Sequence, residues 1–342
     1  MAKEMENDWK GDKPLIDSFG RRITYLRLSV TDRCDLRCTY CMSESPEFAP
    51  KASILTLEEL EAISLAFIAR GVRKIRLTGG EPLGRRNIMH LVEGLSVPLR
   101  DGRLEELTLT TNGTQLSKYA DALKAAGVER INVSLDTLDR VKFAAIARRD
   151  ALSRVLEGID AAQAAGLKIK INTVALKDRN LEEIPQLIEW AHGRGMDLTL
   201  IEVMPLGEVE EDRADQYVPL TSVRKDLERR WTLTPDDHRT GGPSRYVRVS
   251  ETGGRIGFIT PLTGNFCDGC NRVRVTCSGE LFMCLGRQQK IDLRAALREG
   301  GEGAVSTALD EAMRLKPLGH DFESVYKGAA EAPRRFMSAT GG

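Results

Sequence analysis

The sequence predicts an α/β fold, namely a partial, laterally open, TIM-like (β/α)6 barrel followed by a C-terminal α+β extension. Between residues 25 and 204, short runs rich in β-branched residues alternate with amphipathic segments of helical length, which is the pattern of parallel strands joined by crossover helices. The pattern repeats six times, whereas a closed barrel of this type has eight units. We therefore expect the sheet to stay open on one side, where a large substrate could enter.

The six expected strands and the helix ends between them can be placed on the sequence. Strands are predicted at 25–30, 72–78, 106–111, 130–136, 167–174 and 197–204. Thr56 and Glu59 have the spacing of a capping box, and Ser117 is predicted to be the N-cap of a later helix. Gly71, Gly127 and Gly166 stand where a glycine commonly ends a helix.

The character of the chain changes after residue 206. A helix near 221–231 precedes two predicted hairpins, and two more helices are expected near 292–299 and 304–315. The hairpins join 246–250 to 255–260 and 272–276 to 280–284. The final residues show no regular pattern. We therefore expect an N-terminal tail at 1–14, the barrel at 15–206, a C-terminal domain at 207–328 and a C-terminal tail at 329–342.

Composition and charge argue against several classes of protein. The 342 residues include 50 Lys and Arg and 50 Asp and Glu, so the formal net charge is zero. This balance argues against binding to nucleic acid or to an anionic membrane, and any anionic ligand must meet a local group of cations. The first residues lack the apolar core of a signal peptide, and no apolar run approaches the roughly 18 residues of a spanning helix. We therefore expect a cytoplasmic protein.

The seven cysteines form two groups that lie far apart in the sequence. Because the cytosol keeps thiols reduced, such groups indicate metal ligands more readily than disulfides. In the first group, Cys34, Cys38 and Cys41 are separated by three and two residues. Structural zinc and [4Fe-4S] clusters usually take four protein ligands. Three thiolates would therefore leave one iron with an open position, where a small molecule could bind.

The second cysteine group allows two interpretations. Cys267, Cys270, Cys277 and Cys284 could together hold zinc or an iron–sulfur cluster. Alternatively, Cys277 is not a ligand, and the other three form a second site with an open iron. The spacing alone favours neither interpretation.

The first cysteine triplet, with Tyr40 before its last member, resembles the CxxxCxxC motif of radical S-adenosylmethionine enzymes. The resemblance implies that this triplet holds a [4Fe-4S] cluster whose fourth iron binds S-adenosylmethionine, which is cleaved to a 5'-deoxyadenosyl radical. Residues 79–82, Gly-Gly-Glu-Pro, resemble the family's GGEP segment, where the backbone approaches the ligand and the Glu81 carboxylate could accept from an amine. The implied S-adenosylmethionine-binding residues are Tyr40, Gly80, Ser134 and Met204.

From about residue 14 to its end, the chain resembles the GTP 3',8-cyclase family, whose second motif is CxxC-x13-C with Asn-Arg-x-Arg after the first pair. The resemblance implies a second [4Fe-4S] cluster on Cys267, Cys270 and Cys284, and Cys277 departs from the family pattern. The C-terminal Gly341 would then reach into the active site together with Gly342. The implied GTP-binding residues are Arg27, Arg76, Thr110, Lys170, Arg272, Val273 and Arg274.

The resemblance implies a radical lyase that converts GTP to (8S)-3',8-cyclo-7,8-dihydroguanosine 5'-triphosphate, the first step of molybdopterin (molybdenum cofactor) biosynthesis. The implied partners are the cyclic pyranopterin monophosphate synthase that acts next and an electron donor such as flavodoxin or ferredoxin. An alternative is a radical enzyme with an auxiliary cluster that modifies a peptide, although such enzymes usually carry more C-terminal cysteines. The sequence leaves open whether the protein is a monomer or a homodimer.

Overall fold

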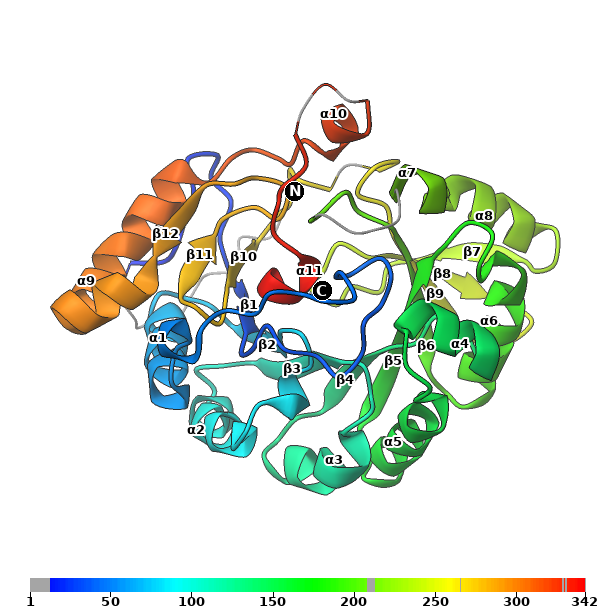
Figure 1. The fold of residues 1–342 in the computed structure, drawn as a ribbon, viewed down its shortest axis with the longest axis horizontal. Coiled ribbons are helices and arrows are strands. Elements are labelled where there is room, and N and C mark those ends of the chain that lie inside the picture. The colour runs from blue at the N-terminus through cyan, green and yellow to red at the C-terminus, as the bar shows by residue number, and fades with distance from the viewer. Residues whose placement is uncertain (1–12, 208–212, 265, 328, 330, 342) are drawn as a thin grey trace.

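A computed structural model describes residues 13–207, 213–264, 266–327, 329 and 331–341. A single 12-stranded sheet runs through them in the order β12-β11-β10-β1-β2-β3-β4-β5-β6-β9-β8-β7. The sheet curves around the centre of the molecule with helices along its outside (Figure 1). Its end strands, β12 and β7, are not paired with each other within the described residues. The prediction of an open, partial α/β barrel is confirmed.

Six parallel strands form the barrel, and each begins and ends within two residues of its predicted bounds. They are β1 (Tyr25–Ser29), β2 (Lys74–Thr78), β3 (Glu106–Thr111), β4 (Arg130–Ser134), β5 (Lys168–Ala175) and β6 (Asp197–Glu202). The longer helices between them are α1 (Leu57–Ala69), α2 (Ile88–Arg100), α3 (Leu116–Ala125), α4 (Arg140–Ala147), α5 (Leu152–Ala164) and α6 (Ile184–Gly193). Most apolar residues of these strands and helices form one large core, which includes the fully buried Leu26, Ile75 and Phe67, and Ile146 of α4 belongs to a smaller cluster. This core packs the strands and helices together and so determines where the loops that follow the strands lie.

Most of the predicted helix ends are confirmed. Thr56 and Glu59 form the capping box that begins α1, and Gly71, Gly127 and Gly166 have the positive φ angles expected after a helix. The prediction for Ser117 is wrong, because α3 begins at Leu116 and Ser117 lies inside its first turn. Burial of Leu116, which is 0% exposed, determines where this helix begins.

The strands after residue 206 extend the same sheet at both of its ends. β10 (Arg272–Val275) pairs in parallel with β1, and β9 (Arg255–Ile259) pairs in parallel with β6. Both predicted hairpins are present, β8 (Arg245–Val249) with β9 and β10 with β11 (Glu280–Phe282). The edge strands β7 (Leu233–Asp236) and β12 (Lys290–Asp292) were not predicted, because a strand of three or four residues has too little periodicity to be recognised.

The remaining helices belong to the C-terminal part of the chain. They are α7 (Arg213–Gln216), α8 (Leu220–Glu228), α9 (Leu293–Leu315), α10 (Phe322–Tyr326) and α11 (Met337–Thr340). The two helices predicted before residue 316 form α9, which is kinked at Gly301. The expectation of an irregular tail is wrong for α11, which lies near the centre of the ring of strands (Figure 1). None of the described helices has the length and apolarity needed to cross a bilayer.

The contact between α3 and α5 yields a test of the fold. A Cβ on Gly158 of α5 would lie 2.2 Å from the Gly113 carbonyl oxygen, so only glycine allows this close approach. We expect Gly158→Ala to lower the free energy of unfolding by about 1–3 kcal/mol through overpacking. Urea denaturation followed by circular dichroism, with both proteins in the same cluster-loading state, measures the difference.

Gly303→Ala in α9 is the matched control. Gly303 is exposed, and nothing lies within 4 Å of the Cβ that it lacks. Alanine should therefore leave stability unchanged or raise it by up to about 1 kcal/mol, as helix propensity predicts. Equal stabilisation by both substitutions would show that α3 and α5 do not pack this closely.

Candidate active site

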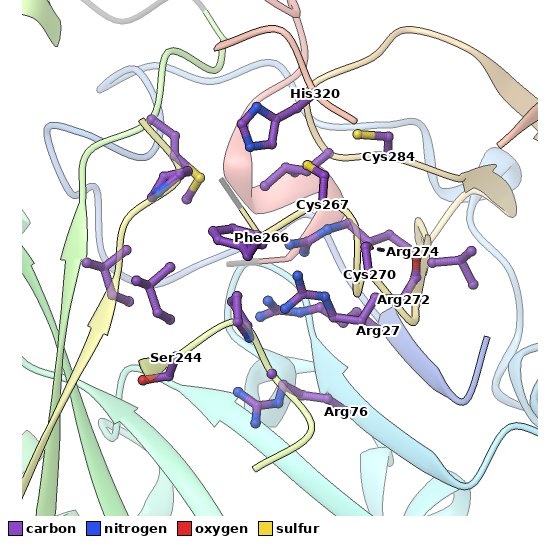
Figure 2. Close-up of a pocket in the computed structure, with 18 of the residues that line it drawn as sticks. Arg27, Arg76, Ser244, Phe266, Cys267, Cys270, Arg272, Arg274, Cys284 and His320 are labelled. Atoms are coloured by element: carbon purple, nitrogen blue, oxygen red, sulfur yellow. Dashed lines mark hydrogen bonds between the residues drawn. The ribbon is translucent and has the colours of Figure 1, made fainter. Parts of the chain in front are cut away.

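Two adjoining cavities bring the predicted site residues together. The first cavity is bordered by Cys34, Cys38, Tyr40, Cys41, Gly80, Thr110, Ser134 and Met204. The second cavity is bordered by Arg27, Arg76, Lys170, Cys267, Cys270, Arg272, Val273, Arg274 and Cys284 (Figure 2). Asn172, Ile201, Met204 and Met337 border both, so a molecule in one cavity would lie beside a molecule in the other.

The first cavity lies at the carboxyl ends of the barrel strands, where the loop that follows β1 carries the first cysteine triplet. This loop packs against the turn that follows β2, since the Gly80 amide donates to the Thr31 carbonyl at 2.8 Å and the Glu81 amide donates to the Arg33 carbonyl at 2.8 Å. A Cβ on Gly80 would lie 2.2 Å from the Arg33 carbonyl oxygen. Glycine is therefore required for the two loops to close on each other.

The first triplet consists of reduced cysteines whose environment suits a metal cluster. Burial raises the pKa of the Cys34 thiol to about 12, and burial likewise raises the pKa of Cys38. Thiols in such a place become thiolates only when a cation compensates their charge. Among the described residues, no three His, Cys, Asp or Glu side chains are arranged around a single metal ion. Each cysteine triplet borders a cavity.

Glu81 does not take the position that the sequence suggested. It is 1% exposed and does not border the first cavity. Its carboxylate accepts hydrogen bonds from the Thr111 hydroxyl at 2.8 Å, the Asn112 amide at 2.7 Å and the Leu83 amide at 3.0 Å. Burial raises its pKa to about 7. Glu81 therefore joins the turns after β2 and β3, and it does not present a free carboxylate to an amine.

Tyr40 is fixed by a residue that sequence reasoning did not assign. Its hydroxyl donates to Asp136 Oδ2 at 2.8 Å, and Asp136 Oδ1 accepts from the Val174 amide at 2.9 Å. Asp136 is 7% exposed, and burial raises its pKa to about 6. Its position just after β4, at the carboxyl end of a parallel strand, is the signal that could have identified it.

The second cysteine triplet lies toward the opposite end of β1. Cys267 and Cys270 precede β10, whose first residue, Arg272, is paired with Tyr25 at the start of β1. Cys284 follows β11, which runs back antiparallel to β10. The two triplets therefore approach the interior of the barrel from opposite ends of its strands, which the sequence did not predict.

Two buried cations hold the segments of the second triplet in place. Lys316, which is 2% exposed, donates to the Met283 carbonyl at 2.6 Å and to the Arg272 carbonyl at 3.0 Å, and its Nζ lies 3.8 Å from Cys270 Sγ. Arg21 donates to the Cys267 carbonyl at 2.8 Å. Although burial opposes it, Arg272 and Lys316 lower the pKa of the Cys270 thiol. Both Lys316 and Arg21 were missed, because nothing in their sequence neighbourhood marks them.

Cys277 is separate from this triplet. It is 3% exposed and does not border the second cavity. Its carbonyl accepts from the Leu55 amide at 2.8 Å, which places it against the segment that leads into α1. Burial raises the pKa of its thiol to about 12. These observations favour the interpretation in which the second site has three cysteines.

Five cations and no carboxylate border the second cavity among the described residues. The register of the sheet places Arg274 beside Arg27 and Arg27 beside Arg76, so three guanidinium groups come from neighbouring strands. Burial, reinforced by the other cations, lowers the pKa of Arg274 well below its usual value. Because arginine keeps its proton in proteins, this shift reports an electrostatic cost that a bound anion would remove. The cavity thus has the charge expected of an anion-binding site.

Two polar side chains orient the cations of the second cavity. Arg76 donates to the Thr110 hydroxyl at 3.2 Å, which connects the arginines to a residue of the first cavity. Lys170 donates to the Tyr246 hydroxyl at 3.0 Å. Ser244, Phe266 and His320 also border the cavity (Figure 2). Ser244 and His320 come from connecting segments without a motif, whereas Phe266 directly precedes Cys267 of the second cysteine motif.

The C-terminal tail enters the site between the two cavities. Met337 of α11 borders both of them, and Arg274 donates to the Gly341 carbonyl. A Cβ on Gly341 would lie 1.8 Å from Thr78 Oγ1, so only glycine fits beside β2. Gly341 therefore lies beside β2 and Arg274, and its role in the active site stays a prediction, whereas Gly342 is outside the described residues.

Comparison with known proteins places the chain in a family. The model of the Radical SAM superfamily matches residues 28–214, and the model named Molybdenum Cofactor Synthesis C matches residues 196–322. A GTP 3',8-cyclase of Erythrobacter litoralis is 65% identical over 96% of this chain and 98% of its own length. Another, from Rhizobium meliloti, is 62% identical over 96% of this chain and 95% of its own length.

A solved structure agrees with the fold. Streptococcus suis SuiB bound to S-adenosylmethionine superposes with a TM-score of 0.59 over 93% of this chain and 75% of its own, at 15% sequence identity. This likeness supports the open barrel and carries no statement about substrate. The identity to the curated relatives over almost the whole chain is decisive, and the protein belongs to the GTP 3',8-cyclase family of radical S-adenosylmethionine enzymes.

Proposed function

We propose that this protein converts GTP to (8S)-3',8-cyclo-7,8-dihydroguanosine 5'-triphosphate, the first step of molybdenum cofactor biosynthesis. The observation that carries the proposal is the pair of adjoining cavities. One is bordered by a three-cysteine motif, and the other by five cations, no carboxylate and a second cysteine triplet. A radical source and a nucleoside triphosphate would therefore meet inside one barrel.

The first cavity would hold the iron–sulfur cluster and S-adenosylmethionine of the radical family. Cys34, Cys38 and Cys41 would bind a [4Fe-4S] cluster, which, with S-adenosylmethionine on its open iron, supplies the 5'-deoxyadenosyl radical. Gly80 borders this cavity, and its backbone would contact the methionyl group. Tyr40, Ser134 and Met204 border the same cavity and would contact the rest of the cofactor.

The second cavity would hold GTP and a second [4Fe-4S] cluster on Cys267, Cys270 and Cys284. Three thiolates would leave an iron open to the guanine, beside Arg272 and Val273. Lys316 supports this assignment, because a buried ammonium 3.8 Å from Cys270 Sγ would stabilise the negative charge of a thiolate-bound cluster. The open iron of the second cluster would thus bind and position the guanine base.

The cations of the second cavity would bind the phosphates. Arg27, Arg76 and Arg274 lie side by side across three strands and offer planar donors, whereas Lys170 approaches from β5 as a point charge. With base and phosphates both held, the ribose C3' would be presented to the first cavity through the shared boundary at Met204. Thr110 would help to fix this boundary through Arg76.

The proposed reaction needs partners, which follow from its chemistry. The cyclised radical must be reduced, so an electron donor such as flavodoxin or ferredoxin is required. The product would be taken up by the next enzyme, such as cyclic pyranopterin monophosphate synthase. We place the protein in the cytoplasm. Peptide modification is the weaker alternative, because a cavity with five cations and no carboxylate suits a polyphosphate better than a general peptide.

The substrate assignment can be tested with anaerobically reconstituted protein, a strong reductant, S-adenosylmethionine and one nucleotide at a time. We expect GTP to be consumed with formation of 5'-deoxyadenosine, and ATP to be inert, when both are followed by liquid chromatography and mass spectrometry. Cys34→Ser should abolish both the consumption of GTP and the formation of 5'-deoxyadenosine. The assignment fails if wild-type protein with a full complement of iron leaves GTP intact.

The second cluster can be tested by comparing two serine variants. Two [4Fe-4S] clusters give about eight iron atoms per chain. We expect Cys284→Ser to retain about four of them and Cys277→Ser to retain all, because Cys277 does not border the second cavity. Iron analysis and Mössbauer spectroscopy of anaerobically purified protein measure this. Iron loss in Cys277→Ser together with full loading of Cys284→Ser would reverse the ligand assignment.

The role of the tail can be tested by Gly341→Ala. The added methyl would lie 1.8 Å from Thr78 Oγ1, so the tail must move and Arg274 must lose its contact with the Gly341 carbonyl. A displacement of this size should lower GTP turnover by about a hundredfold without loss of iron. Gly303→Ala serves as the control and should keep full turnover. Undiminished turnover in Gly341→Ala would mean that the tail does not act at this position.

A further inference from the structure

Lys170 is a buried cation that pairs with no carboxylate among the residues that the structure describes. It is 6% exposed and borders the second cavity from the middle of β5. Its ammonium donates to the Tyr246 hydroxyl at 3.0 Å, and Tyr246 is a residue of β8 that is 3% exposed. Burial lowers the pKa of Lys170, and the interaction with Tyr246 opposes that shift.

The phenol ring is held in one place. The Tyr246 hydroxyl lies 3.4 Å from the Thr240 hydroxyl, which is its second polar contact. On the neighbouring strand, a Cβ on Gly257 would lie 2.9 Å from the ring, so the ring in this position packs directly against the glycine. A fixed ring gives Lys170 a fixed acceptor.

The nearby Lys74 differs from Lys170 because its partner is a carboxylate and not a tyrosine hydroxyl. Its ammonium donates to the carboxylate of Glu106, which also pairs with Arg130. A carboxylate neutralises the charge of a lysine, so a phosphate would have to displace the carboxylate before it could bind the lysine. A phenol hydroxyl instead accepts one hydrogen bond and leaves two further N–H donors of the ammonium available to an anion.

We propose that Tyr246 is a positioning residue that holds the Lys170 side chain aimed at the phosphates of the substrate. The inference rests on the proposed function, because it assumes that GTP occupies the second cavity. Tyr246 does not take part in the radical chemistry, so its contribution belongs to binding of the triphosphate. Tyr246 lies on β8, in the C-terminal extension, so this extension also contributes to the position of Lys170 in the substrate site.

The test compares Tyr246→Phe with wild type under anaerobic turnover conditions. Loss of a hydrogen bond to a charged group corresponds to about a tenfold weakening of binding. We expect the KM for GTP to rise about tenfold with kcat nearly unchanged, whereas binding of guanosine, which lacks phosphates, stays as in wild type. Tyr119→Phe on the outer helix α3 is the matched control and should change neither quantity.

A double-mutant cycle separates positioning from general damage. In a Lys170→Met background, the further change Tyr246→Phe should weaken GTP binding no more, because the lysine that it positions is gone. Additive losses would overturn the inference, as would an unchanged KM in Tyr246→Phe or equal weakening of GTP and guanosine. If wild type itself does not convert GTP, the proposed function fails, which is a different outcome.

Thr240→Val provides an independent variant if Tyr246→Phe does not retain its iron. It removes the second contact of the same hydroxyl and leaves the ring in place. We expect the KM for GTP to rise about threefold with kcat unchanged, because a neutral hydrogen bond contributes less than one to a charged group. An unchanged KM in this variant would also overturn the inference.

Discussion

The parallel pairing of β1 with β10 is the constraint on which the site depends. It joins segments from opposite ends of the sequence, and its register places Arg274 beside Arg27, which in turn lies beside Arg76 on β2. The same pairing sets the two cysteine triplets apart, because the first follows the end of β1 and the second precedes the start of β10. A substrate that lies between the two cysteine triplets can therefore contact the groups bound at each of them.

Charge is distributed unevenly within this frame. The whole chain is electrically balanced, yet five cations border the second cavity without a carboxylate among the described residues. Buried cations that repel one another raise the free energy of the protein without ligand, and a polyphosphate would lower it. Outside the cavity, Lys74 is paired with the carboxylate of Glu106. The second cavity thus gathers buried positive charge at the place where an anion is expected.

The strand pattern could be predicted because parallel strands buried on both faces leave a strong apolar signal, and all six barrel strands lie within two residues of the expected bounds. The failures have local causes. β7 and β12 are too short for periodicity, and α3 begins at Leu116 because that side chain is buried, although Ser117 is the better N-cap. The division of the chain into domains stays a prediction, since the C-terminal strands continue the barrel sheet.

The sequence by itself determined the chemistry of this protein, because cysteine spacing and the family motifs are local patterns that need no knowledge of the fold. Only the tertiary structure decided which groups meet. Glu81 is turned into a hydrogen-bond network away from the cavity, Cys277 packs away from the second triplet, and Tyr246 reaches Lys170 from another part of the sheet. These outcomes depend on strand register and on packing between residues distant in sequence, which a local pattern does not encode.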